Sequence, residues 1–169
     1  MRLTPIALSV ALALATMGSA GHGQKPDDQI DARSVAFVRQ GEALTTSAQY
    51  DAAIDALESA LVIDPRNRAA YVGLAQVAQG QKLPGKAVAL YAEALKLEPN
   101  DPTALAGQGE ALVQRGAVER AKQNLEKLHK ICKAPCPQAT TLSAAIAKGP
   151  PPERLTARAP EPAVPEAKN

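Results

Sequence analysis

The residues best suited to chemistry are two cysteines and a histidine in the run HKICKAPCPQ. Cys132 and Cys136 are the only cysteines of the chain. They stand four residues apart, and the intervening Ala134-Pro135 favours a turn, so the two thiols can approach to bonding separation in an oxidising compartment. We therefore predict a structural disulfide between Cys132 and Cys136. Because the closed loop is short, its expected role is to fix the bend between two helices.

Two other interpretations of these residues stay open. His129, Cys132 and Cys136 are a possible metal-binding trio, although a structural zinc site needs four ligands and the sequence offers no evident fourth. The cysteines are alternatively free or regulatory thiols. Neither the Cys-x-x-Cys redox motif nor the haem-attachment motif is present. We predict no metal and no cofactor.

The segment from Gly80 to Lys86, GQKLPGK, has the glycine and lysine spacing of a phosphate-binding loop. The position that should hold Ser or Thr for magnesium is Ala87, and a helical pattern rather than a strand precedes the segment. Gly107-Gln108-Gly109 likewise lacks the third glycine of a dinucleotide fingerprint. No nucleophile elbow or paired-histidine zinc helix appears, so the sequence predicts no catalytic residues and a protein that is not an enzyme.

Composition argues against nucleic acid as a partner. The net charge is +2, with basic and acidic residues interleaved. One Phe, three Tyr and no Trp leave few aromatic side chains for stacking bases. Alanine supplies much of the hydrophobic content, as close packing of helix on helix would favour.

The elements that hold these residues repeat along the chain. The helical pattern YDAAIDALESALVIDP, residues 50–65, returns 34 residues later as PGKAVALYAEALKLEP, and a further 34 brings VERAKQNLEKLHKICK. The preceding segments repeat with the same period, and small residues recur at Gly41, Ala75 and Gly109. The third copy is degenerate at its end, where Lys133 replaces the proline.

A 34-residue period of helix, turn and helix resembles the tetratricopeptide repeat family. The resemblance implies an all-α fold: a right-handed solenoid of three helix–turn–helix repeats within 31–133 (34–67, 68–101 and 102–133). A solenoid leaves its last apolar face open unless something covers it. We expect residues 134–148 to supply a turn containing Cys136 and a capping helix that presents Leu142 and Ile146.

The flanking segments differ in composition. Residues 1–20 have a basic start, an apolar run and Gly18-Ser19-Ala20, which predicts a secretory signal peptide. An uncleaved membrane anchor is the alternative, but about 15 apolar residues are short for about 30 Å of hydrocarbon, so we expect no membrane insertion after cleavage. Residues 21–30 form a flexible lead-in, and the proline-rich tail 149–169 is predicted to be disordered.

The resemblance also implies where a ligand binds. In the family, the first helix of each repeat lines a concave groove, chiefly through its fifth and ninth positions. These positions are here occupied by Val38 and Glu42, Val72 and Gln76, and Ala106 and Glu110. The second and twelfth positions add further lining residues, which are Val35, Thr45, Ala69, Gln79, Thr103 and Val113.

Family members that grip a C-terminal carboxylate use Lys, Asn and Arg at the fifth and ninth positions, and this clamp is absent. Glu42 and Glu110 instead favour a ligand with Lys, Arg or a free amino group beside apolar contacts. The alternative is that both are ordinary solvated helix positions, because surface charges contribute little energy.

Together these features predict a small exported bacterial protein of the periplasm that acts as a protein–protein interaction scaffold. Its partner would be another protein or an exported peptide segment held in the concave groove. The alternative is a structural accessory subunit of an envelope complex that packs through its convex or C-terminal surface. The sequence leaves the oligomeric state open.

Overall fold

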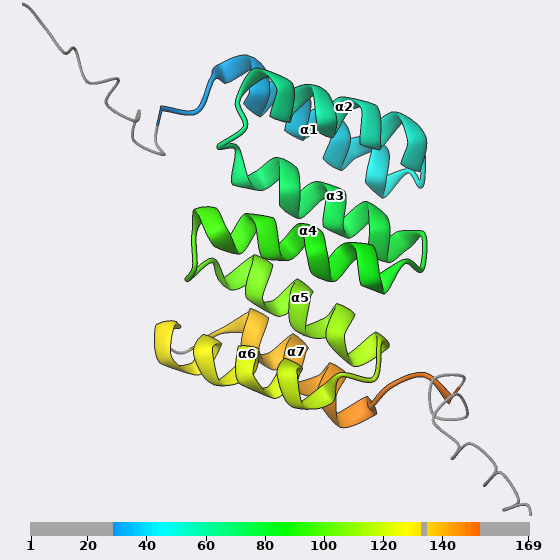
Figure 1. The fold of residues 1–169 in the computed structure, drawn as a ribbon, viewed down its shortest axis with the longest axis vertical. Coiled ribbons are helices and arrows are strands. Elements are labelled where there is room, and N and C mark those ends of the chain that lie inside the picture. Colours follow the sequence, from blue (N-terminus) through cyan, green and yellow to red (C-terminus); the bar gives the residue numbers. More distant parts are fainter. Residues whose placement is uncertain (1–28, 133–134, 153–169) are drawn as a thin grey trace, which may run out of the picture.

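The computed structural model describes residues 29–132 and 135–152, which form seven α-helices and no strand (Figure 1). The predicted signal peptide, most of the lead-in and residues 153–169 lie outside the described part. The all-α fold class is confirmed. The helices are α1 (Ala32–Thr46), α2 (Tyr50–Ile63), α3 (Arg68–Gly80), α4 (Pro84–Leu97), α5 (Pro102–Gln114), α6 (Val118–Ile131) and α7 (Pro137–Lys148).

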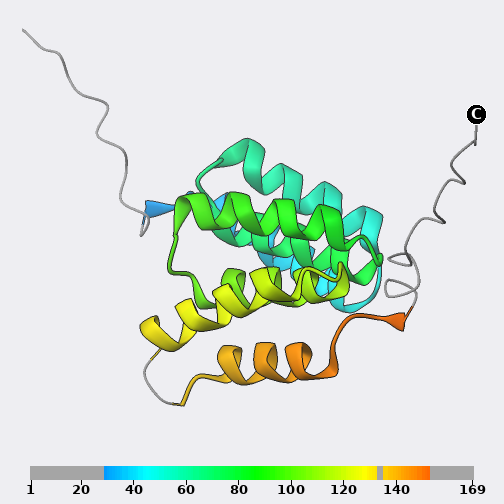
Figure 2. The same ribbon diagram turned by 60° about the horizontal axis from the view of Figure 1, so that its bottom comes forward.

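The helices form a solenoid of successive hairpins. α1 packs on α2, α3 on α4 and α5 on α6, and each pair packs on the next along one axis (Figure 1). α7 packs against both α5 and α6 and covers the last pair (Figure 2). It therefore occupies the place expected of a capping helix.

Proline sets the ends of the second helix in the first two hairpins. Asp64 follows α2 with φ −140° and ψ 100°, and Glu98 follows α4 with φ −138° and ψ 95°. Each precedes a proline, whose ring disfavours helical backbone in the residue before it. α6 also ends in an extended residue, Cys132, although Lys133 rather than a proline follows it.

The turn inside each hairpin contains one residue in the left-handed backbone region. These residues are Ala48 (φ 57°), Lys82 (φ 59°) and Gly116 (φ 80°), and they stand 34 positions apart. Left-handed backbone is sterically costly for any residue with a Cβ. Only the third hairpin therefore has the residue that its turn geometry favours.

Leucines on one helix pack directly on glycines of another, which allows the helix axes to approach closely. Leu57 of α2 is fully buried and lies against Gly41 of α1 and Gly73 of α3. Leu142 of α7 is also fully buried and lies against Gly109 of α5. A Cβ at any of these three glycines would overlap the leucine side chain.

Buried apolar residues form two clusters along the solenoid. We call the first the N-terminal core, and it consists of Val38, Ala53, Leu57, Ala60, Ala70, Leu74 and Val77. The C-terminal core lies further along the chain and includes Val72, Val88, Tyr91, Leu105, Leu112, Leu128 and Leu142. Leu90 of α4 is partly buried against both.

Polar side chains link the beginnings of α1, α3 and α5. Asn67 directly precedes α3, but its side chain makes no capping bond and donates instead to Ser34 Oγ at 2.8 Å. Ser34 in turn donates to the carbonyl of Ala60 at 2.7 Å. Asp101 caps α5, accepting from Ala104 N at 2.8 Å, and also pairs with Arg68 at 2.6 Å. The side chain at the start of α3 thus stabilises the packing between hairpins rather than its own helix.

Candidate functional site

The six predicted groove residues fall into two groups. Val38, Val72 and Ala106 are buried, with exposed fractions of 5%, 9% and 6%, and all three belong to the hydrophobic cores. Glu42 and Gln76 are exposed, and Glu110 is partly buried. The polar ninth positions therefore reach solvent while the apolar fifth positions mainly pack the helices together. Their role in binding stays a prediction.

The structure brings Gln76, Ala106 and Glu110 together at one concave hollow of about 380 Å³. We call it the Glu110 hollow. Residues from four helices line it: Gln76 and Gln79 of α3, Tyr91 of α4, Thr103, Ala106, Gly107 and Glu110 of α5, and Pro137, Gln138 and Thr141 of α7. Val38, Glu42 and Val72 are not among them.

One wall of this hollow is fixed by Tyr91. Its ring is 2% exposed and packs on Gly107, where a Cβ would overlap the ring. Its hydroxyl donates to Gln79 Oε1 at 2.7 Å. Burial, together with the nearby charge of Glu110, raises the pKa of Tyr91 well above its usual range. The phenol therefore stays a hydrogen-bond donor and holds the Gln79 amide in place.

Glu110 is the acidic group of the hollow. Burial raises the pKa of its carboxyl above the ordinary value of 4.5, because the charged form loses hydration. No salt bridge in the described part of the chain involves Glu110. A partly desolvated carboxylate without a counter-ion is stabilised by a cation, so the hollow is chemically suited to a Lys, Arg or amino group.

A second hollow shares Glu110 with the first. It has a volume of about 720 Å³ and lies between the C-terminal halves of α5 and α7. We call it the triproline hollow, because its lining residues are Glu110, Val113, Gln114, Ala145, Lys148, Gly149 and Pro150–Pro152. Residues 149–152, the start of the predicted tail, thus lie beside α5. The two hollows share Glu110, which is the only acidic side chain in either lining.

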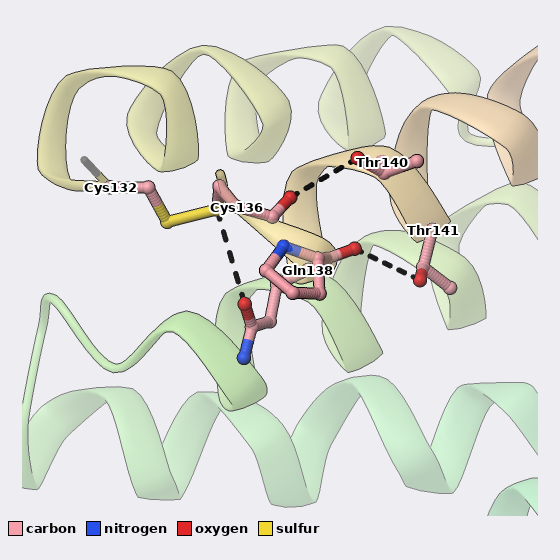
Figure 3. The surroundings of a disulfide bond; sticks show 6 residues. Cys132, Cys136, Gln138, Thr140 and Thr141 are labelled. Atoms are coloured by element: carbon pink, nitrogen blue, oxygen red, sulfur yellow. Dashed lines mark hydrogen bonds between the residues drawn. A yellow bond between two sulfur atoms is a disulfide. The ribbon is translucent and has the colours of Figure 1, made fainter. Parts of the chain in front are cut away.

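Cys132 and Cys136 form a disulfide at the bend between α6 and α7, with their Cα atoms 5.7 Å apart (Figure 3). The disulfide predicted from the sequence is therefore present. At the start of α7, Thr140 Oγ1 donates to the Cys136 carbonyl at 3.2 Å and Thr141 Oγ1 to the Pro137 carbonyl at 3.0 Å (Figure 3). The bonded cysteines, Ala139 and His129 line a separate hollow between α6 and α7.

The other candidate motifs take ordinary structural positions. The phosphate-loop spacing from Gly80 to Lys86 spans the turn between α3 and α4, so a helix precedes it. Bonded cysteines offer no thiolate to a metal, and residues 29–132 and 135–152 contain no group of three or more metal-binding side chains. None of the helices in that part of the chain has the length and apolar character needed to cross a bilayer.

Comparison with known proteins identifies the family. A family model described as tetratricopeptide repeat matches residues 38–102 and 78–123. The chain belongs to the tetratricopeptide repeat family, as its 34-residue period predicted. A comparison with curated proteins finds no match for the sequence.

Several solved structures share the fold. The tetratricopeptide domain of Sgt2 from Aspergillus fumigatus superposes with a TM-score of 0.64 at 22% identity, over 82% of this chain and 92% of that one. The first such domain of Spaghetti (RPAP3), bound to the HSP90 peptide SRMEEVD, gives 0.63 at 21% identity, over 70% and 94%. An O-GlcNAc transferase of Thermobaculum terrenum gives 0.56 at 23% identity, over 69% of this chain but 23% of that one.

Sequence reasoning missed the contribution of α7 to the site. Pro137, Gln138 and Thr141 line the Glu110 hollow, although α7 was assigned only a capping role. The repeat pattern also did not indicate that Tyr91 would form a wall of the hollow. Helix periodicity could have indicated that α7 has a second, polar face, but it could not show where that face lies.

Proposed function

We propose that this protein is a non-enzymatic binding module that holds a basic segment of a partner protein along α3, α5 and α7. Glu110 would pair with a Lys or Arg side chain or a free amino group of that segment. The observation that carries the proposal is that Glu110 is partly buried, has a raised pKa and has no cation partner among the described residues. Apolar and amide groups around it offer further contacts.

The comparison with the peptide-bound Spaghetti domain supports a peptide as the ligand but argues for the opposite charge. That domain is bound to SRMEEVD, a peptide with two glutamates and an aspartate. In this chain, the ninth positions of the first and third repeats are Glu42 and Glu110, and no fifth or ninth position is basic. An acidic peptide would be repelled here, whereas a basic one would be attracted.

A pair of peptides tests the proposal directly. The probes are SRMEEVD and a derivative of it, amidated at its C-terminus, in which lysine replaces each acidic residue. We expect the lysine peptide to bind with a Kd in the micromolar range and the acidic peptide not to bind, as measured by isothermal titration calorimetry. Glu110→Gln should weaken the lysine peptide about tenfold or more, since a hydrogen bond to a charged group contributes about 1.5–3 kcal/mol.

Glu126→Gln is the matched control, because Glu126 is exposed on α6, outside both hollows. It removes the same charge and should leave the affinity unchanged. Equal binding of both peptides, or equal loss in both variants, would reject specific recognition at Glu110. Absence of binding to either peptide would favour the alternative of a structural accessory subunit that packs through its convex or C-terminal surface.

We further propose that the protein acts in the bacterial periplasm. The signal-like residues 1–20 and the disulfide of Cys132 and Cys136 support this location, since disulfides persist in oxidising compartments. Expression of the full chain in a Gram-negative bacterium should release a periplasmic product that begins at Gly21, as read by intact-mass spectrometry. Leu12→Arg, which interrupts the apolar run, should keep the chain uncleaved in the cytoplasm. Cleavage unaffected by this substitution would argue against the signal.

A further inference from the structure

The chain leaves the described structure beside the candidate site. α7 ends at Lys148, and Gly149, with φ 76°, turns the backbone there. Pro150–Pro152 then follow in the triproline hollow, which shares Glu110 with the Glu110 hollow. Figure 2 shows this short segment rising from the end of α7 and then running outward past the ends of the other helices. Residues 150–152 therefore lie at one end of the proposed peptide path.

The following segment is long enough to lie along that path. Residues 153–169 number seventeen. A polyproline-like chain rises about 3.1 Å per residue, so these residues can span about 50 Å. Helices pack at about 8–10 Å, so the path from α7 across α5 to α3 is about 20 Å. Fewer than half of the seventeen residues are needed.

The charge of the first part of the segment also matches, although the whole of residues 153–169 has as many acidic as basic side chains. Its first part, residues 153–159, carries Arg154 and Arg158 against the single acidic residue Glu153. The path that it would meet contains Glu110, the one acidic side chain that lines either hollow, while Lys148 lines the triproline hollow near the exit point. Arginine offers five N–H donors and keeps its charge at any physiological pH, which suits pairing with a partly desolvated carboxylate.

We propose that residues 153–169 are an intramolecular occupant of the groove, with Arg154 or Arg158 paired to Glu110. This inference rests on the proposed function, because it assigns the same carboxylate to a ligand within the chain. A partner segment must then displace the chain's own segment. A tether of this kind gives an effective concentration in the millimolar range, so even a weak contact lowers the apparent affinity for a partner.

The experiment uses the chain from Gly21 onward, labelled with ¹⁵N, in three forms: wild type, the double variant Arg154→Glu with Arg158→Glu, and the control Lys168→Glu. The control also changes a basic residue of the segment to glutamate, but far from the exit point. We expect the double variant to shift the backbone amide signals of Gln76, Ala106 and Glu110, and the control to leave them in place. The shifts should not depend on protein concentration.

A titration with the lysine peptide completes the test. We expect the double variant to bind this peptide at least about threefold more tightly than the wild type, because the competing segment is released. Unchanged amide signals with equal peptide affinity in all three forms would overturn the intramolecular contact and leave the proposed function intact. Shifts confined to the hollow between α6 and α7, or shifts that grow with protein concentration, would also overturn it. Amide shifts in the groove without any peptide binding would instead reject the proposed function.

Discussion

Glu110 carries an electrostatic cost in the unbound protein. Burial raises its pKa in the folded state above the value in the unfolded chain, so the folded state binds the proton more firmly. Between the unfolded and folded pKa values the folded state holds more protons, and stability therefore falls as the pH rises through that window. Above the folded pKa the cost is present in full. A cationic ligand would relieve it.

Glu110→Gln should therefore be more stable than the wild type at about pH 7, and this difference should shrink as the pH falls towards the ordinary Glu value of 4.5. Urea denaturation of both proteins across this range measures the difference. In the same range the wild type should lose affinity for the lysine peptide as Glu110 takes up a proton, while the variant should show no such loss. A stability difference that is constant with pH would contradict the assigned protonation behaviour.

Two substitutions at the left-handed residues of the turns should have opposite effects on the stability of the fold. Gly116→Ala should destabilise the fold by about 1–2 kcal/mol, because the added Cβ meets no neighbouring atom within 4 Å and the whole cost is backbone strain. Lys82→Gly should stabilise it, by up to about 1 kcal/mol after the added entropy of the unfolded chain is deducted. Thermal or urea unfolding measures both changes.

Gly85→Ala is the control for these two substitutions. Gly85 lies in α4 with open space around the position of its Cβ and without a positive φ, so alanine should be neutral or stabilise by at most about 1 kcal/mol. If Gly116→Ala changed the free energy of unfolding no more than Gly85→Ala does, the positive φ of Gly116 would not strain an alanine at this position.

At the scale of the helices, most of the fold could be predicted from the sequence. The 34-residue period predicted all six repeat helices, and apolar spacing predicted α7. These features depend on local patterns that repeat or end at proline. Whether a side chain caps its own helix or binds another depends on the distance between hairpins, which sequence spacing does not give. Asn67 is an example, because it stands at the cap position of α3 but its side chain binds Ser34.

The candidate site was only partly predictable for the same reason. Glu110, Gln76 and Ala106 converge because their repeat positions face the same side of adjacent helices. Val38 and Val72 occupy positions equivalent to that of Ala106, and all three belong to the cores, but only Ala106 lines the hollow. The contribution of Gln138 depends on how α7 is rotated about its axis, and that rotation follows from Leu142 packing on Gly109.

Leu142→Ala should therefore affect both stability and the site. Removing a fully buried leucine costs about 2–5 kcal/mol, and here it also removes the contact that positions α7. Urea denaturation should show this loss, and hydrogen exchange should increase more in α5 and α6 than in α1 and α2. Ser143→Ala, at the adjacent exposed position, should change stability by less than about 0.5 kcal/mol. A uniform increase in exchange across all helices would contradict the local role of α7.

At the scale of the whole molecule, each hairpin contacts mainly its neighbours. The N-terminal and C-terminal cores meet at Leu90, which is partly buried against both. Stability in such an array is approximately a sum of hairpin terms and terms between neighbouring hairpins. A ligand that follows the path from α3 to α7 would contact the second hairpin, the third hairpin and the capping helix together. It should therefore stabilise their association as well as occupy the hollow.

The sum of neighbour terms can be tested with Leu57→Val and Leu142→Val, which each delete one methylene group from a fully buried side chain at opposite ends of the solenoid. Each should cost about 1 kcal/mol, which keeps the double variant folded. Because the two leucines belong to different cores and share no contact partner among the glycines they cover, the double variant should lose the sum of the two single effects within about 0.5 kcal/mol. The three free energies of unfolding from urea denaturation give the coupling directly. A larger coupling free energy would mean that the packing of the two cores is linked through α4. A ligand at Glu110 could then influence α1 as well.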